Sequence, residues 1–324
     1  MTKTVLTVGM LCVDTIFTVD DYPKEDSKVR AHSREQTIGG NSANISTVLK
    51  QLNCEGVVCA RIGTCAASTF VTDELNKRGL RAFLLVQEGG DIPASAVYTS
   101  NKTGSRTCMC YRGNSTEFTG QEVIDSVGDQ HGNFNYDWVH LEHRGNGLET
   151  VKLAQHIKSS PYPPILSAEI EKIRDGLYDL MSIVDYVTIS KEVCKDLGFV
   201  SMESALTSLG PKSNRLIITW GEKGAGIWLN NPDEIMASES VLESMKCGYL
   251  SVTGNILHCR VFSVTEIVDS IGAGDSFSAG FIASMLDSES DKLIKLEGPK
   301  GIEQALVNGC HIAAIKLGKK GLQI

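Results

Sequence analysis

Short apolar runs rich in β-branched residues alternate with segments of helical periodicity, and this alternation constrains the fold more than any other feature of the sequence. The runs predict buried strands at residues 5–8, 56–60, 138–141, 165–168, 184–189 and 216–219. Helical spacing predicts helices between them at residues 41–52, 69–78, 147–158, 191–197 and 202–209. Together they predict an α/β fold, a mostly parallel sheet with helices on both faces. No linker rich in proline, glycine or serine divides the chain, so we expect one domain over residues 1–324.

Two regions depart from this alternation. Residues 11–19 with 28–37, and residues 94–100 with 106–111, alternate polar and apolar side chains as half-exposed antiparallel strands do. The second pair is joined by Asn101-Lys102-Thr103-Gly104, a favourable turn sequence. We interpret the two hairpins as a small β lid formed from about 11–38 and 94–112. The alternative is an extension of the sheet edge with no covering role.

Charge and composition exclude several classes of protein. With 31 basic against 39 acidic residues the net charge is −8, which argues against a nucleic-acid-binding surface. No apolar run approaches the roughly 18 residues of a membrane-spanning helix, and residues 1–13 resemble an opening strand more than a signal peptide. The ten cysteines lack C-x-x-C spacing, which fits reduced thiols. We therefore expect a cytoplasmic protein that binds neither nucleic acid nor membrane.

The most informative segment for chemistry is 267–277, which predicts a strand running into a glycine-rich turn, with a helix continuing through 278–286. Gly272 and Gly274 allow the backbone to approach a ligand closely. The first amide groups of a helix lack intrahelical acceptors and, with the helix dipole, form a site for a phosphate. The turn is not a Walker A loop, and it lacks the third glycine of the dinucleotide fingerprint.

Asp275 places a carboxylate in the first turn of that helix. A carboxylate would weaken simple phosphate binding, but it is useful if it accepts the proton of a hydroxyl that attacks a phosphoryl group. The alternative is an aspartate that favours a helix N-terminus and has no chemical role. The spacing of the four residues Gly-Ala-Gly-Asp does not by itself decide between these two interpretations.

A second polar cluster opens the predicted helix at 41–52. Asn41 and Asn44 are three residues apart and share a helix face, and their amides suit a polyhydroxylated ligand. Helix capping would explain one asparagine but not both. Asp14 follows the first strand, where ligands gather in open α/β sheets. Asp26 lies between the first two lid strands and, taken alone, is a turn residue.

Two further segments could contact a nucleotide. Arg106 on the second lid hairpin could bind phosphate oxygens, although a solvated strand arginine is the simpler interpretation. Residues 220–224 follow a buried strand, and their glycines would let a flat base lie against the backbone, but a structural turn explains them equally well. We reject metal sites at Cys108 and Cys110 and at His140, Glu142 and His143, because neither group has a second ligand pair.

The assembled motifs resemble the PfkB, or ribokinase-like, family of sugar kinases over nearly the whole chain. The resemblance rests on 22–27, 39–41, 104–107, 138–142, 190–193, 197–199 and the signature at 269–277. It implies the ribokinase-like α/β fold and transfer of the γ-phosphoryl group of ATP to the C1 hydroxyl of a ketohexose, with fructose as the first candidate. The alternatives are a related kinase for another sugar or a nucleoside, or a non-catalytic sugar- or nucleotide-binding protein.

The same resemblance implies roles for single residues. Asp275 would be the base, and Gly272, Ala273 and Gly274 the anion hole. The ketose hydroxyls would be held by Asp14, Gly40, Asn41 and Asn44, while Asp26 would reach the sugar of a neighbouring subunit in a homodimer joined through the lids. Nucleotide contacts would come from Arg106, Gly221, Glu222, Lys223 and Gly224. Mg²⁺-ATP and a potassium ion near the anion hole would serve the reaction.

The sequence departs from the family pattern at several places. Ser190-Lys191-Glu192-Val193 stands where many relatives have Asn-x-x-Glu, so the metal ligands are not assigned. Lys316-Leu317-Gly318 replaces an expected lysine-cysteine-glycine sequence beside the adenine. The segments 231–255 and 288–300 have no counterpart in the family pattern.

Overall fold

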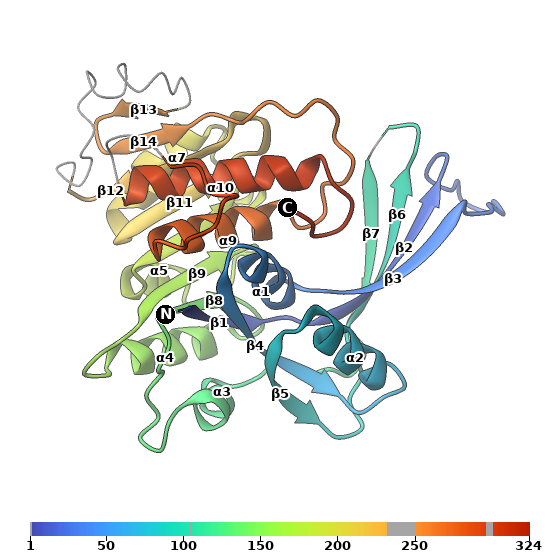
Figure 1. Cartoon of the computed structure of the whole chain (residues 1–324), viewed down its shortest axis with the longest axis horizontal. Coiled ribbons are helices and arrows are strands. Elements are labelled where there is room, and N and C mark those ends of the chain that lie inside the picture. The colour runs from blue at the N-terminus through green and yellow to red at the C-terminus, as the bar shows by residue number, and fades with distance from the viewer. Residues whose placement is uncertain (1, 104, 232–249, 296–300) are drawn as a thin grey trace.

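The computed structural model describes residues 2–103, 105–231, 250–295 and 301–324. It contains two β-sheets, a large one with strand order β13-β14-β12-β11-β10-β9-β8-β1-β4-β5 and a small one with order β3-β2-β6-β7. Figure 1 shows the small sheet projecting from the α/β body. The two segments without a family counterpart, and the turn at 101–104, are described in part, since 232–249, 296–300 and Gly104 lie outside the described residues.

The large sheet confirms the predicted parallel core. All six predicted strands are present, as β1 (Lys3–Gly9), β4 (Cys54–Gly63), β8 (Trp138–Glu142), β9 (Ile165–Ile170), β10 (Tyr186–Ser190) and β11 (Arg215–Thr219). They pair in parallel with their neighbours. The pattern did not predict β5 (Arg81–Gln87), nor the antiparallel extension of β12 (Ala225–Leu229), β13 (Leu250–Thr253) and β14 (Ile256–Cys259).

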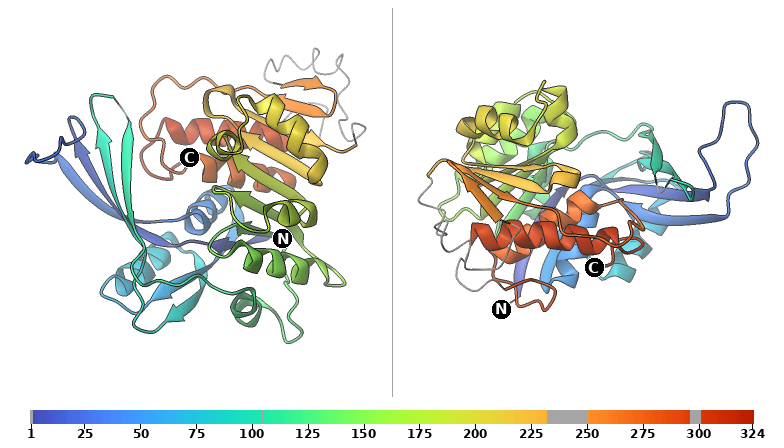
Figure 2. Two further views of the ribbon diagram at one scale, coloured as in Figure 1. Left: turned by 180° about the vertical axis from the view of Figure 1, so that it is seen from behind. Right: turned by 90° about the horizontal axis from the view of Figure 1, so that it is seen from above.

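Helices cover both faces of this sheet, as expected. They are α1 (Asn41–Gln51), α2 (Ser68–Arg78), α3 (Gly120–Val127), α4 (Gly147–Lys158), α5 (Leu177–Ile183), α6 (Lys191–Asp196), α7 (Met202–Leu209), α9 (Ala273–Met285) and α10 (Ile302–Leu317). Alternate residues of β1 point to opposite faces. Val5 belongs to the core shared with α1, α9 and α10, whereas Leu6 belongs to the core shared with α3, α4, α5 and α7. Figure 2 shows these two helical layers from behind and from above.

The small sheet is made of the two predicted hairpins, β2 (Cys12–Val19) with β3 (Ser33–Gly39) and β6 (Ala94–Ser100) with β7 (Arg106–Tyr111). The antiparallel pairing expected within each hairpin is confirmed, but the two hairpins join through β2 and β6, which pair in parallel. Both strands leave the body of the molecule in the same direction, so the hairpins meet side by side with the same orientation (Figure 1). Every residue of β7 is exposed, which leaves this edge of the sheet uncovered.

The strand expected before the glycine-rich turn is absent. Residues 261–271 have no helix or strand, and the side chains of Ile267 and Val268 are 58% and 53% exposed. The backbone amides of Val268 and Asp269 donate instead to the Leu317 carbonyl at the end of α10, at 2.8 and 3.3 Å. Helix α9 does begin at the turn, at Ala273.

Within the described ranges, no helix is both long enough and apolar enough to cross a membrane. The nine cysteines in those ranges are free thiols, six of them buried.

Candidate active site

Polar residues collect at the carboxyl edge of the parallel strands. Glu142 and Glu169 are register partners at the ends of β8 and β9, and Ser190 and Thr219 are partners at the ends of β10 and β11. Helix α9 packs beside α1, and Asn44 of α1 bonds Asp275 in the first turn of α9. This edge is where open α/β sheets bind ligands, so it is the candidate active site.

Asp275 is buried in the first turn of α9 and is held by Asn44. Asn44 Nδ2 donates to Asp275 Oδ2 at 2.7 Å. Burial raises the pKa of the Asp275 carboxyl well above its ordinary value, the negative charge of Glu169 adds to this effect, and the Asn44 bond opposes it. A carboxylate with a raised pKa accepts a proton from a hydroxyl more readily than an ordinary carboxylate does.

The turn before Asp275 has the geometry of an anion site. Gly272 caps α9 in the left-handed region at φ 76°, and the first amide with an intrahelical acceptor is that of Ser276, which donates to the Gly272 carbonyl at 2.9 Å. The amides of Ala273, Gly274 and Asp275 therefore lack that partner. A Cβ on Gly274 would have no described heavy atom within 4 Å, so this side of the turn has room for a ligand.

Asn41 is also bound to a carboxylate. Asn41 Nδ2 donates to Glu169 Oε1, so both asparagines of the predicted pair contact a buried acid. Burial raises the pKa of Glu169 to about 8, and the neighbouring charge of Glu142 adds to this rise. Sequence reasoning missed Glu169, although a charged residue directly after an apolar strand run was a usable signal.

A chain of buried polar groups leads from the core to Glu169. Trp138 Nε1 donates to Ser167 Oγ at 2.7 Å, and Ser167 Oγ lies 2.7 Å from His140 Nδ1. Because the indole can only donate, Ser167 Oγ is its acceptor, and the serine hydroxyl links Trp138 to His140. His140 Nε2 faces Glu169 Oε2 at 3.6 Å. Burial lowers the pKa of His140 to about 4, so this histidine is neutral at pH 7.

The glycines at 39 and 40 allow Asp14 to lie beside the start of α1. A Cβ on Gly39 would come within 2.0 Å of Asp14 Oδ2. Gly40 has φ 94°, and its Cβ would come within 2.2 Å of the Met10 carbonyl oxygen. Burial raises the pKa of Asp14, whose Oδ1 accepts a bond from Cys12 Sγ at 3.4 Å. The two glycines are required by space, and Gly40 also by its backbone angle.

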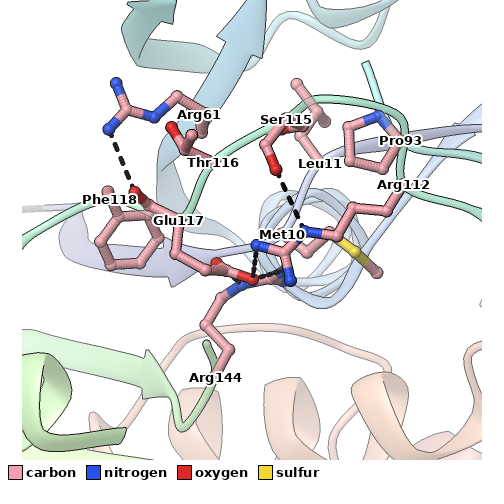
Figure 3. Close-up of a pocket in the computed structure, with 11 residues that line it drawn as sticks. Met10, Leu11, Arg61, Pro93, Arg112, Ser115, Thr116, Glu117, Phe118 and Arg144 are labelled. Carbon is pink, nitrogen blue, oxygen red and sulfur yellow. Dashed lines mark hydrogen bonds and ion pairs between the residues drawn. The ribbon is translucent and has the colours of Figure 1, made fainter. Parts of the chain in front are cut away.

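Arg144 and the Met10 amide hold Glu142 at the end of β8. Glu142 Oε2 accepts from the Met10 amide at 2.6 Å, and Arg144 Nη1 donates to Glu142 Oε1 at 3.0 Å. Arg144 also donates from Nε to Glu117 Oε2 at 2.6 Å. Figure 3 shows Arg112 and Arg144 converging on the Glu117 carboxylate in a pocket beside Met10. All the charges in this network are paired.

The turn predicted to border the nucleotide lies next to Lys191, in the stretch that stands where many relatives have Asn-x-x-Glu. Gly221–Lys223 form a 3₁₀ turn after β11, and Lys191 Nζ bonds Glu222 Oε1 at 2.8 Å. Ser190 caps α6 by accepting from the Val193 amide at 3.3 Å. A Cβ on Gly224 would lie 2.1 Å from the Cys259 carbonyl oxygen. The backbone therefore requires a glycine at this position whether or not a nucleotide binds.

Arg106 and Asp26 lie at the same, outer end of the small sheet but on opposite sides of it, Arg106 on the edge strand β7 and Asp26 in the loop that joins β2 to β3. Arg106 Nη1 donates to Ser270 Oγ at 3.3 Å, which places the guanidinium two residues from the anion-site turn. Asp26 is exposed, with φ 58°, in the loop between β2 and β3 at the outer end of the sheet (Figure 1). The structure therefore brings Arg106 to the site of its own chain and does not bring Asp26 there.

The described residues contain no group of three or more His, Cys, Asp and Glu side chains arranged to hold a metal ion. Cys108 and Cys110 are exposed on β7, while His140 and His143 are buried.

Proteins of known structure or function resemble this chain over nearly its whole length. The structure of ribokinase from Giardia lamblia superposes with a TM-score of 0.76 at 16% identity, covering 99% of this chain and 96% of that one. The fold is therefore ribokinase-like. Ketohexokinase of Mus musculus is 31% identical over 98% of this chain and 97% of its own length, and ribokinase of Haemophilus influenzae is 22% identical over 100% and 95%.

Residues 2–324 match the pfkB family carbohydrate kinases, and the chain belongs to this family. It is a phosphotransferase with an alcohol group as acceptor, and its small-molecule partners are a sugar and ATP with a divalent metal ion. The relatives differ in the sugars that their names specify, so membership defines the reaction type and not the substrate.

Proposed function

We propose that this chain transfers the γ-phosphoryl group of ATP to the C1 hydroxyl of a ketohexose, with fructose as the preferred substrate. The observation that carries the proposal is the buried Asp275 carboxylate, which has a raised pKa and lies beside the free amides of a helix start. The choice of a ketohexose is supported by the 31% identity to mouse ketohexokinase.

In this mechanism the C1 hydroxyl gives its proton to Asp275 as its oxygen attacks the γ-phosphorus, and the bond to ADP breaks. The amides at Gly272, Ala273 and Gly274 stabilise the charge on the transferred group, which is the main contribution that a protein makes to phosphoryl transfer. Asp14, Gly40, Asn41 and Asn44 hold the sugar. Asn41 and Asn44 each keep a carbonyl oxygen and a second amide hydrogen for this purpose.

The nucleotide would lie between the anion-site turn and the turn at 221–224. Its phosphates would be contacted by Arg106, whose bond to Ser270 beside the anion-site turn supports this role. Its other border would be formed by Gly221, Glu222, Lys223 and Gly224. Mg²⁺ fits this site as an ion that arrives on ATP, since magnesium is commonly bound through substrate phosphates and few protein groups. When bound, it would neutralise phosphate charge.

Potassium fits this site less well. The oxygens of Asp269, next to the anion site, accept bonds from Lys316 Nζ and from the amides of Ile271 and Gly321. A potassium ion at these oxygens would have to share them with a buried ammonium and two backbone amides, and no step of the proposed reaction depends on it.

We further propose that the small sheet is a lid of a single domain, and that two lids join a cytoplasmic homodimer in which Asp26 reaches the partner's sugar. Large apolar side chains exposed on or beside this sheet support the interface, with Tyr22 and Met109 each 51% exposed and Tyr111 62% exposed. Lid closure would keep water away from the γ-phosphoryl group.

An ATP-to-ADP assay over ketoses, aldoses and nucleosides tests this function. We expect turnover with fructose above all other acceptors and loss of turnover in Asp275→Asn. Preference for an aldose or a nucleoside would replace the proposed substrate. A folded wild-type protein that binds sugar and ATP without turnover would support the non-catalytic alternative.

A further inference from the structure

Lys316 is a buried charge that the proposed reaction does not use. It lies in the last turn of α10 with 0% of its side chain exposed. Its Nζ donates to the Asp269 carbonyl oxygen at 2.7 Å and lies 3.1 Å from Asp269 Oδ2. A buried ammonium is costly unless it is paired and hydrogen-bonded. Both atoms that the ammonium contacts belong to Asp269, so Lys316 fixes the position of this residue.

Asp269 in turn fixes the backbone that leads into the anion site. Its Oδ1 accepts from the Ile271 amide at 2.8 Å, and its Oδ2 accepts from the Gly321 amide at 3.0 Å. Ile271 is adjacent to Gly272, the cap of α9. Asp269 therefore connects the end of α10 to the residue that precedes the anion-site turn.

This connection matters because residues 266–271, directly before the turn, belong to no helix or strand that would hold them in place. Residues 261–271 have no strand neighbours, and Ile267 and Val268 are more than half exposed. Near the turn, this segment has three other hydrogen bonds among the described residues. The amides of Val268 and Asp269 donate to the Leu317 carbonyl, and Arg106 donates to the Ser270 hydroxyl. A glycine-rich turn without a preceding strand needs such anchors to hold its amides in one orientation.

We propose that Lys316 is a positioning residue for phosphoryl transfer. Through Asp269 it holds the backbone at Ile271 and Gly272, so that the first amides of α9 point to the place where the transferred group develops charge. The inference rests on the proposed function, because that reaction is what requires these amides to be fixed. Since Lys316 has no exposed surface, it does not contact ATP or sugar directly.

The test compares Lys316→Met with Lys319→Met, a matched control in which an exposed lysine three residues away is changed. A misplacement of about 1 Å in a catalytic group can cost about 10²-fold in rate. We expect Lys316→Met to lower kcat by about 10- to 100-fold and to leave the Kd for fructose within about twofold, because the sugar is held by other elements. The control should keep both values.

A second variant keeps the test decisive if Lys316→Met does not fold. Asp269→Asn retains the size of the side chain and an acceptor for Ile271, but it removes the charge partner of Lys316. It should show the same loss of kcat with sugar binding kept. The double variant should be little worse than the poorer single variant, because the two residues act as one unit.

The outcomes separate this inference from the proposed function. If the wild-type chain has no kinase activity, the proposed function fails. If the wild-type chain is active and a folded Lys316→Met or Asp269→Asn protein keeps its kcat, the positioning role is wrong. A variant that loses kcat and fructose affinity by the same factor and also melts at a lower temperature would contradict it too, because these changes together would indicate a purely structural role.

Discussion

Asn44 Nδ2 donates a 2.7 Å hydrogen bond to Asp275 Oδ2, joining two helix starts that are 231 residues apart in the sequence. The bond holds one oxygen of the proposed base and leaves the other for the substrate. It also places an amide of the proposed sugar-binding cluster next to the proposed base. The proposed reaction needs the sugar hydroxyl at this junction.

Asp275→Asn should lower kcat by about 10²–10⁴-fold, because it removes the proton acceptor and keeps the size of the side chain. Sugar binding should survive. Steady-state kinetics with fructose, together with fluorescence-detected sugar binding, measures both effects. Unchanged turnover in a folded variant would remove Asp275 from the mechanism.

The raised pKa of Glu169 predicts a pH-dependent stability. Its pKa is about 8 in the folded protein against an ordinary 4.5. The folded state thus favours the protonated form of Glu169. The contribution of this carboxyl group to the free energy of unfolding is fully present below pH 4.5 and is lost as the pH rises through about 8. Glu169→Gln should therefore raise the melting temperature relative to wild type more at pH 9 than at pH 5.5.

Differential scanning fluorimetry across this pH range tests the prediction, with Glu289→Gln as a control at an exposed position. The control should show no such trend. A gain for Glu169→Gln that is equal at both pH values would mean that Glu169 titrates as an ordinary carboxylate.

Arg106→Ala should lower kcat/KM for ATP by about one to two decades, the loss expected for a charge-assisted bond in a partly dry site. The melting temperature should change little, because the residue is exposed. Arg106→Lys should restore only part of the loss, since lysine lacks the planar fork.

Ser270→Ala separates the two possible partners of Arg106. It removes the observed acceptor and leaves phosphate contact intact, so kcat/KM should stay near the wild-type value. If Arg106→Ala has normal kinetics, the arginine is a solvated strand residue, and the small sheet loses its proposed link to the nucleotide.

The homodimer proposal predicts that light scattering at micromolar concentration gives twice the 35.0 kDa chain mass. Asp26→Ala should weaken fructose binding and leave the dimer intact, because Asp26 would serve the partner's site. A monomer that phosphorylates fructose at the full rate would exclude the cross-subunit role.

Arg144→Met should destabilise the protein by about 1–3 kcal/mol, the usual cost of leaving hydrogen-bonded groups of a partly buried network without one of their partners. The change leaves Glu117 and Glu142 without their shared partner. Chemical denaturation measures the loss. A change below about 0.5 kcal/mol, the usual range for surface substitutions, would show that the network is dispensable for stability.

The parts of the fold set by local patterns could be predicted from the sequence. Apolar runs and helical spacing identified the six parallel strands and α4 at 147–158, because these signals lie within each segment. The parallel pairing of β2 with β6 could not be predicted, since it depends on how two separate hairpins leave the body. The apolar residues near 267 suggested a strand, but the end of α10 supplied their hydrogen-bond acceptor.

The same distinction applies to the site. Asp275 was identified by the turn that precedes it, which is a local feature. The pairing of Asn41 with Glu169 and the anchor from Lys316 to Asp269 join residues 128 and 47 positions apart, and no local pattern specifies such contacts.

The position of the transferred phosphate tests the central claim most directly. The wild-type protein is incubated with ATP, Mg²⁺ and fructose labelled with ¹³C at C1, and the product is examined by NMR. The proposed mechanism predicts ¹³C–³¹P coupling at C1, with one ADP formed for each sugar phosphate. Phosphate at any other carbon, or ADP formation that does not depend on fructose, would contradict the proposal.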